Sequence, residues 1–161
     1  MDIGVLKRTT FVVPNATQAA KFYQDVFGWT VWYDNILEAD KRFPPSGASD
    51  KAKVKLVILQ AVDPKLGKIG FLEYIDPPFD IGYLSNRCKI RMGEPILVIE
   101  SEDIHGVYER AIEAGANVIT EPVDWYVPSP NGESKIHLRT VSMFDPFGIY
   151  MEVSDHPSRK K

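Results

Sequence analysis

Two stretches of the chain carry apolar residues at the three- and four-residue spacing of an amphipathic helix. Each stretch follows a residue suited to cap a helix, Asn15 or Asp103. Each ends near a glycine suited to a left-handed C-cap, Gly28 or Gly115. The apolar positions are Ala19, Phe22, Tyr23, Val26 and Phe27 in the first stretch and Ile104, Val107, Tyr108, Ala111 and Ile112 in the second. The pattern therefore predicts two helices of similar design.

Strand-like apolar segments surround each predicted helix in the same order. One strand precedes the first helix, at residues 5–13, and three follow it, at 30–38, 53–62 and 68–75. The second helix has one strand before it, at 95–100, and three after it, at 117–127, 135–144 and 149–154. This order, written twice, is an internal repeat. It predicts an α+β fold of two βαβββ modules.

The repeat also predicts how the chain is organised. We expect a single domain over residues 1–161, with module one at about 5–76, a linker at about 77–93, module two at about 94–155 and a disordered tail at 156–161. One helix for every four strands covers only one face of a sheet. We therefore expect curved mixed sheets that enclose a cavity, with the helices outside.

Several short motifs in this order resemble one family. The turn Asp145-Pro146-Phe147-Gly148, followed by a strand that contains Glu152, resembles the closing motif of vicinal-oxygen-chelate proteins, the glyoxalase, bleomycin-resistance and extradiol-dioxygenase superfamily. Phe22-Tyr23 followed by Phe27-Gly28 resembles the first helix of that family, and residues 111–116 resemble the second. The likeness extends from about residue 5 to residue 154.

The resemblance implies a divalent metal held on the concave sheet face by a histidine or glutamine, a second histidine and two glutamates. Glu73 and Glu152 match the glutamates, but the histidine positions fall on Arg8 and Ile96. Arginine has no lone pair to donate, and isoleucine has no donor atom. His137 has the strand phase of Val141 and is expected to point away from the cavity. We therefore expect a member of the family without a metal or another cofactor.

Alternation along the strands then predicts which residues line the cavity. Trp125 precedes a proline- and glycine-rich loop, where it forms either an aromatic wall for a ligand or packing at a dimer seam. Trp32 is assigned to the core or to an interface. The expected lining is Arg8, Thr10, Phe71, Glu73, Leu138, Thr140, Ser142, Tyr150 and Glu152.

The charged members of this set have two interpretations each. Arg8 either anchors an anionic group of a ligand or neutralises Glu73 or Glu152 in place of the metal. Glu73 and Glu152 either act as a general base or are inherited from a metal-binding fold without chemistry. The favoured function is metal-independent binding of a small, partly apolar, anionic or aromatic molecule, as in resistance proteins. The alternatives are a lyase or isomerase with Glu73 or Glu152 as base and Arg8 as clamp, and a metal-dependent glyoxalase or ring-cleaving dioxygenase.

Composition and charge limit the kinds of partner that are expected. The net charge of −3 argues against nucleic acid as a partner. No apolar stretch approaches the roughly 18 residues of a membrane span. The single cysteine, Cys88, fits a reducing compartment, and the first residues lack the apolar run of a signal peptide. We expect a cytoplasmic protein, and the family resemblance implies a homodimer.

Overall fold

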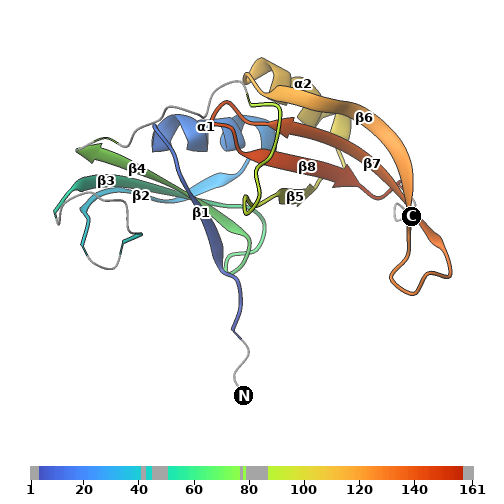
Figure 1. Cartoon of the computed structure of the whole chain (residues 1–161), viewed down its shortest axis with the longest axis horizontal. Coiled ribbons are helices and arrows are strands. Elements are labelled where there is room, and N and C mark those ends of the chain that lie inside the picture. The colour runs from blue at the N-terminus through green and yellow to red at the C-terminus, as the bar shows by residue number, and fades with distance from the viewer. Residues whose placement is uncertain (1–3, 41–42, 45–50, 77, 79–86, 158–161) are drawn as a thin grey trace. The chain divides into compact units, whose positions relative to one another are not determined.

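The computed structural model describes residues 4–40, 43–44, 51–76, 78 and 87–157 (Figure 1). The chain divides into two compact units, Met1–Gly82 and Tyr83–Lys161. Most of the expected linker and residues 158–161 of the expected tail lie outside the described residues.

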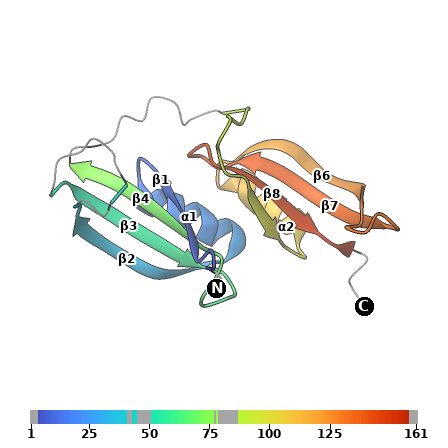
Figure 2. The ribbon, with the colours of Figure 1, turned by 60° about the horizontal axis from the view of Figure 1, so that its bottom comes forward.

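The first unit contains β1 (Arg8–Val12), α1 (Ala16–Phe27), β2 (Thr30–Glu38), β3 (Lys53–Gln60) and β4 (Lys68–Asp76). The strands form one sheet in the order β1-β4-β3-β2. β1 runs parallel to β4, and the other neighbours are antiparallel. α1 lies along one face of this sheet and contacts β3 and β4 (Figure 2).

The second unit repeats this arrangement. It contains β5 (Leu97–Glu100), α2 (Ile104–Glu113), β6 (Asn117–Pro128), β7 (Lys135–Phe144) and β8 (Tyr150–Asp155). The sheet order is β5-β8-β7-β6, with β5 parallel to β8. α2 packs on β6, β7 and β8. The prediction of two βαβββ modules with mixed sheets is confirmed.

The helix ends follow the sequence signals. Asn15 accepts a hydrogen bond from the backbone N–H of Gln18 at 2.9 Å, and Asp103 accepts one from that of Gly106 at 3.0 Å. Both side chains thereby satisfy N–H groups that have no partner within the helix. Gly28 and Gly115 have φ angles of 69° and 85°, in the left-handed region that glycine adopts without strain.

The face of each sheet that meets its helix forms the main core. In the first unit, Phe22, Tyr23 and Val26 of α1 are buried, as are Val57 and Phe71 of the sheet. The corresponding buried residues of the second unit are Ile104, Val107 and Ala111 of α2 and Val141, Met143, Met151 and Val153 of the sheet. Burial of these side chains supplies the main driving force for folding each unit.

A second apolar cluster covers part of the opposite face of the first sheet. Leu72, Tyr74 and Val54 pack with Ala39 and Ala52, and half-buried Phe43 contacts the same cluster. The Tyr74 hydroxyl also donates a hydrogen bond to the Pro44 carbonyl at 3.1 Å. The end of β4 is therefore filled on this face, and open space remains near its beginning, at Lys68 and Gly70.

The turn between β7 and β8 is closed by Asp145. The Asp145 carbonyl accepts a hydrogen bond from the N–H of Gly148 at 3.0 Å, as expected for the predicted turn. The buried Asp145 carboxylate accepts two more, from the N–H groups of Phe147 at 2.9 Å and Ile149 at 2.8 Å. Arg87 donates to the Gly148 carbonyl at 3.0 Å.

Among the described residues, none of the helices is long and apolar enough to cross a bilayer.

Candidate functional site

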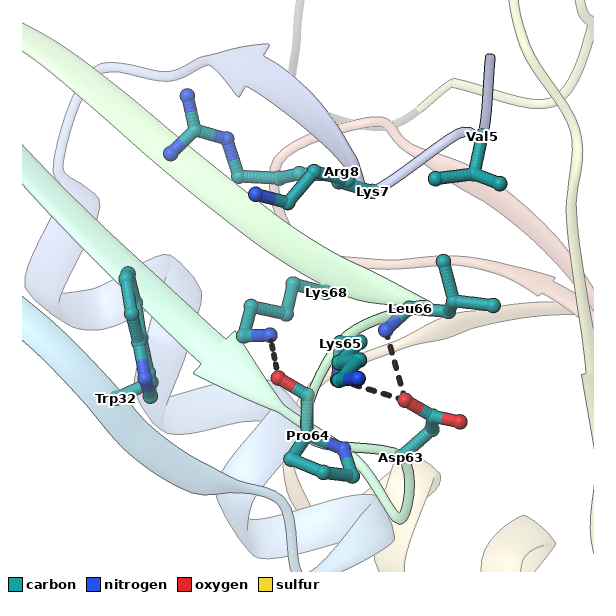
Figure 3. A pocket seen from close by; sticks show the side chains of 9 residues that line it. All are labelled: Val5, Lys7, Arg8, Trp32, Asp63, Pro64, Lys65, Leu66 and Lys68. Carbon is teal, nitrogen blue, oxygen red and sulfur yellow. Dashed lines mark hydrogen bonds between the residues drawn. The ribbon is translucent and has the colours of Figure 1, made fainter. Parts of the chain in front are cut away.

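A basic hollow of about 920 Å³ opens on the first unit at the start of β1 and β4 (Figure 3). Four cationic side chains line it: Lys7, Arg8, Lys65 and Lys68. Trp32, Val5, Pro64 and Leu66 supply the apolar part of the wall, and Asp63 is the one acidic residue of the lining. Figure 3 shows Lys7 and Arg8 on one side of the hollow, with Trp32 and Pro64 on the other.

The pairing of β1 with β4 places Arg8 in this hollow. Arg8 is the register partner of Lys68, and Thr10 is the partner of Gly70. A Cβ atom on Gly70 would lie 2.8 Å from the Thr10 hydroxyl oxygen and 3.2 Å from Cδ of Arg8. Gly70 therefore leaves the room in which Arg8 and Thr10 lie across the open face of β4. Among the described residues of the first unit, the Arg8 guanidinium forms neither a hydrogen bond nor an ion pair.

Trp32 reaches the hollow because β2 contains a bulge. The register of β2 against β3 shifts between Val31 and Tyr33, so Trp32 is the extra residue. Its ring lies 5.2 Å from the Lys68 ammonium, within the range of a cation–π contact. Trp32 is 58% exposed. The assignment of Trp32 to the core is therefore wrong, since a bulge redirects its side chain to the wall of the hollow.

Asp63 is occupied by the turn that it closes. Its carboxylate accepts hydrogen bonds from the N–H groups of Lys65 at 2.6 Å and Leu66 at 2.9 Å. These backbone hydrogen bonds, followed by the charges of Lys68 and Lys65, hold the pKa of Asp63 below its usual range. Lys68 donates to the Pro64 carbonyl. One bound carboxylate thus faces four cations, and the hollow has an excess of positive charge.

Two predicted cavity residues of β4 lie on the other face of the sheet. Phe71 is fully buried, and its ring lies 5.1 Å from that of Tyr23 on α1. Glu73 accepts a hydrogen bond from the backbone N–H of Ala16, the first residue of α1, at 2.9 Å. The placement of both residues in the cavity is therefore corrected. Glu73 acts as an anion at a helix N-terminus, where negative charge is favourable.

A smaller polar hollow of about 240 Å³ lies on the sheet of the second unit. Five residues expected in the cavity line it: Trp125, Thr140, Ser142, Tyr150 and Glu152. They share a face because Ser142 pairs with Glu152 and Thr140 with Ser154. Trp125 donates its indole N–H to the Thr140 hydroxyl at 2.8 Å. The arrangement forms a polar wall with one carboxylate.

Thr120 and Val123 also line the polar hollow and were missed by the sequence analysis. The register of β6 against β7 shifts on both sides of Thr120, so simple alternation fails along this strand. Leu138 is the register partner of Trp125 and is half-buried beside the hollow.

His137 lies away from the polar hollow. It stacks on Tyr126, with ring centroids 4.8 Å apart, and its Nε2 lies 2.9 Å from the Asp124 carboxylate. Arg139 donates two hydrogen bonds to the same carboxylate, each at 3.1 Å. Hydrogen bonds from Arg139, and then from His137, lower the pKa of Asp124. The Asp124 carboxylate is therefore already paired with Arg139 and His137.

The described side chains do not fit a divalent metal. No group of three or more histidine, cysteine, aspartate or glutamate side chains gathers within the described part of the chain. At the position expected for the first ligand, the hollow presents the guanidinium of Arg8, and Glu73 is bound to α1. Transition metals in proteins require several nitrogen, oxygen or sulfur donors around one point.

Each of the two βαβββ units has a helix on one face of its sheet and polar residues on the other. The model of the glyoxalase/bleomycin resistance protein/dioxygenase superfamily matches residues 5–153. The chain belongs to this superfamily.

Solved structures agree with this fold. A glyoxalase family protein from Bacillus cereus is 17% identical, with a TM-score of 0.75, covering 96% of this chain and 95% of that one. A glyoxalase/bleomycin resistance protein/dioxygenase family enzyme from Burkholderia phytofirmans is 18% identical, with a TM-score of 0.55 and coverage of 95% and 99%. The trypanothione-dependent glyoxalase I of Leishmania major is 16% identical, with a TM-score of 0.59 and coverage of 97% and 89%. No curated protein matches the sequence.

Proposed function

We propose that this chain binds a small, partly apolar anion in the basic hollow and that it does so without a metal. The supporting observation is the convergence of four cations and Trp32 around one hollow, in which the single carboxylate is already bound by backbone N–H groups. Arginine binds carboxylates through a planar fork of two N–H donors. Trp32 and the apolar lining contact the rest of the ligand.

One of the two counter-ions considered for Arg8 is removed by its position in the first unit, and Glu152 as the counter-ion stays a prediction. Glu73 is bound to α1 and lies on the opposite face of the sheet, so it does not serve as a counter-ion for Arg8. The lyase or isomerase alternative loses Glu73 as its base for the same reason. Glu152 as a base stays a prediction. The fold by itself does not choose among these activities, because one fold supports many unrelated ones.

A matched pair of probes tests the proposal. 2-Naphthoate and 2-naphthylmethanol share the same ring system but differ in charge. We expect the full chain to bind 2-naphthoate more tightly, with a shift of the Trp32 indole resonance in ¹H–¹⁵N spectra. Charge-assisted hydrogen bonds contribute about 1.5–3 kcal/mol. Replacement of Arg8 by glutamine is therefore expected to weaken 2-naphthoate binding by roughly 10- to 100-fold, measured by calorimetry.

Lys53→Gln is the control for Arg8→Gln, because Lys53 is an exposed cation of the same unit outside the hollow. It removes the same charge and is expected to leave the affinity for 2-naphthoate unchanged. Equal binding of the two probes would contradict the proposal. So would an equal loss of affinity in the Lys53 and Arg8 variants, since that result indicates a general charge effect.

The proposal includes a cytoplasmic homodimer. β1 and β5 are outer strands of their sheets, and such edges carry backbone groups available for pairing. In the single chain, the apolar residue Val98 of β5 is 73% exposed. Such exposure is expected of a residue that a second copy of the chain covers. Exposed Cys88 is compatible with a reducing compartment. Sedimentation velocity is expected to give twice the chain mass of 18.2 kDa. A monomer at micromolar concentrations would refute the dimer.

A further inference from the structure

The polar hollow of the second unit differs in charge from the basic hollow of the first. Glu152 is the one ionised side chain of its lining, and no lysine or arginine lines it. Among the described residues of the second unit, the Glu152 carboxylate accepts no hydrogen bond and forms no ion pair. Glu152 is also half-buried. A carboxylate that is partly removed from water is stabilised by a hydrogen-bond donor or a cation. No such partner is bound to Glu152 within the second unit, so a ligand can supply it.

The hydrogen bonds around Glu152 fix the remaining polar groups. The Trp125 indole N–H, the one donor of that side chain, is used by the Thr140 hydroxyl at 2.8 Å. Thr140 in turn lies 2.9 Å from the Ser154 hydroxyl. Trp125 is therefore held in place, and its π-system, rather than its N–H, is what it offers to a ligand. Trp125 is 44% exposed, so part of its ring is open to a ligand.

A carboxylate beside an aromatic wall is the combination that recognises an ammonium group. The carboxylate accepts charge-assisted hydrogen bonds from N–H donors, and an indole ring attracts a cation electrostatically. The hydroxyls of Ser142 and Tyr150 line the same hollow and provide further acceptors. An anion would instead be repelled by Glu152, and no cation of the lining would compensate.

We propose that the polar hollow of the second unit takes the ammonium group of a small aromatic or alkyl amine between Glu152 and Trp125. Its volume of about 240 Å³ suits a small group rather than a large ligand. The site goes beyond the anion binding proposed for the first unit, because it uses other residues, another unit and the opposite charge.

Three probes of one shape test this assignment on the full ¹⁵N-labelled chain. 2-Phenylethylamine carries the cation, 2-phenylethanol is its neutral counterpart, and phenylacetate is an anion with the same ring. We expect the amine to shift the Trp125 indole resonance and to bind at least about tenfold more tightly than the alcohol, in line with one charge-assisted contact. Trp29, which stacks on Tyr23 at 5.7 Å in the first unit, is the reference resonance.

The decisive variant is Glu152→Gln, which keeps the shape of the side chain and removes its charge. It is expected to lower the affinity for the amine to that for the alcohol and to leave the affinity for the alcohol unchanged. Glu113→Gln is the matched control, because Glu113 is an exposed carboxylate at the end of α2. If Glu152→Gln does not fold, the comparison of amine with alcohol on the unmodified chain decides instead.

Several results would overturn the assignment. Equal affinities for the amine and the alcohol would remove the role of charge. An amine that shifts Trp32 instead of Trp125 would place the binding elsewhere. An unchanged affinity in Glu152→Gln, or an equal loss in Glu113→Gln, would exclude Glu152 as the recognising group. The basic hollow is tested with other probes and through Trp32, so failure of one proposal is distinguishable from failure of the other.

Discussion

Replacement of Phe71 by alanine is expected to lower the free energy of unfolding by about 3–5 kcal/mol. Phe71 is fully buried between the sheet and α1, and its ring contacts that of Tyr23 at a centroid distance of 5.1 Å. Loss of the ring removes buried apolar surface and leaves a cavity. Urea unfolding, followed by circular dichroism, measures the change. The affinity of the folded variant for 2-naphthoate is expected to stay the same.

Glu73→Gln is the companion variant, because both residues were first assigned to the cavity. Glutamine keeps an oxygen that accepts the hydrogen bond from Ala16, so only the charge at the start of α1 is lost. That loss corresponds to about 0.3–1 kcal/mol. A variant of either residue that bound 2-naphthoate weakly but unfolded at the normal urea concentration would show that the cavity assignment was right after all.

Replacement of Asp145 by alanine is expected to lower the free energy of unfolding by about 2–4 kcal/mol. The carboxylate is 3% exposed and accepts hydrogen bonds from the N–H groups of Phe147 and Ile149. Alanine leaves both donors without this acceptor, that of Ile149 buried and that of Phe147 partly buried, and unpaired buried polar groups are costly. The turn between β7 and β8 is then expected to loosen, which amide hydrogen exchange at Ile149 detects.

Asp145→Asn separates the geometry of this turn from its charge. Asparagine keeps one oxygen at the same position, so it is expected to retain most of the stability that alanine loses. If alanine and asparagine are equally destabilising, the charge of Asp145 matters more than its position in the turn. If neither variant changes the urea midpoint, the carboxylate does not hold the turn.

The sequence by itself determined the elements of this protein and which residues of β7 and β8 share a face in the polar hollow. Apolar spacing and capping residues located both helices, and the repeat predicted two βαβββ modules. Alternation also placed Thr140, Ser142, Tyr150 and Glu152 on one face, as the structure has them. These inferences succeeded because helix periodicity, capping and the two-residue repeat of a regular strand are local properties of the chain.

Only the tertiary structure decided which residues line the basic hollow. Glu73 was placed from a family motif and Phe71 from the strand phase that it shares with Glu73, whereas the pairing of Phe11 with Phe71 sets which face of β4 meets α1. Trp32 enters the hollow through a bulge, and the cluster around Leu72 and Tyr74 fills the rest of that face. Register and bulges depend on residues far apart in the sequence, and a shift of one residue exchanges the two faces of a strand. The local pattern of polar and apolar residues does not contain that information.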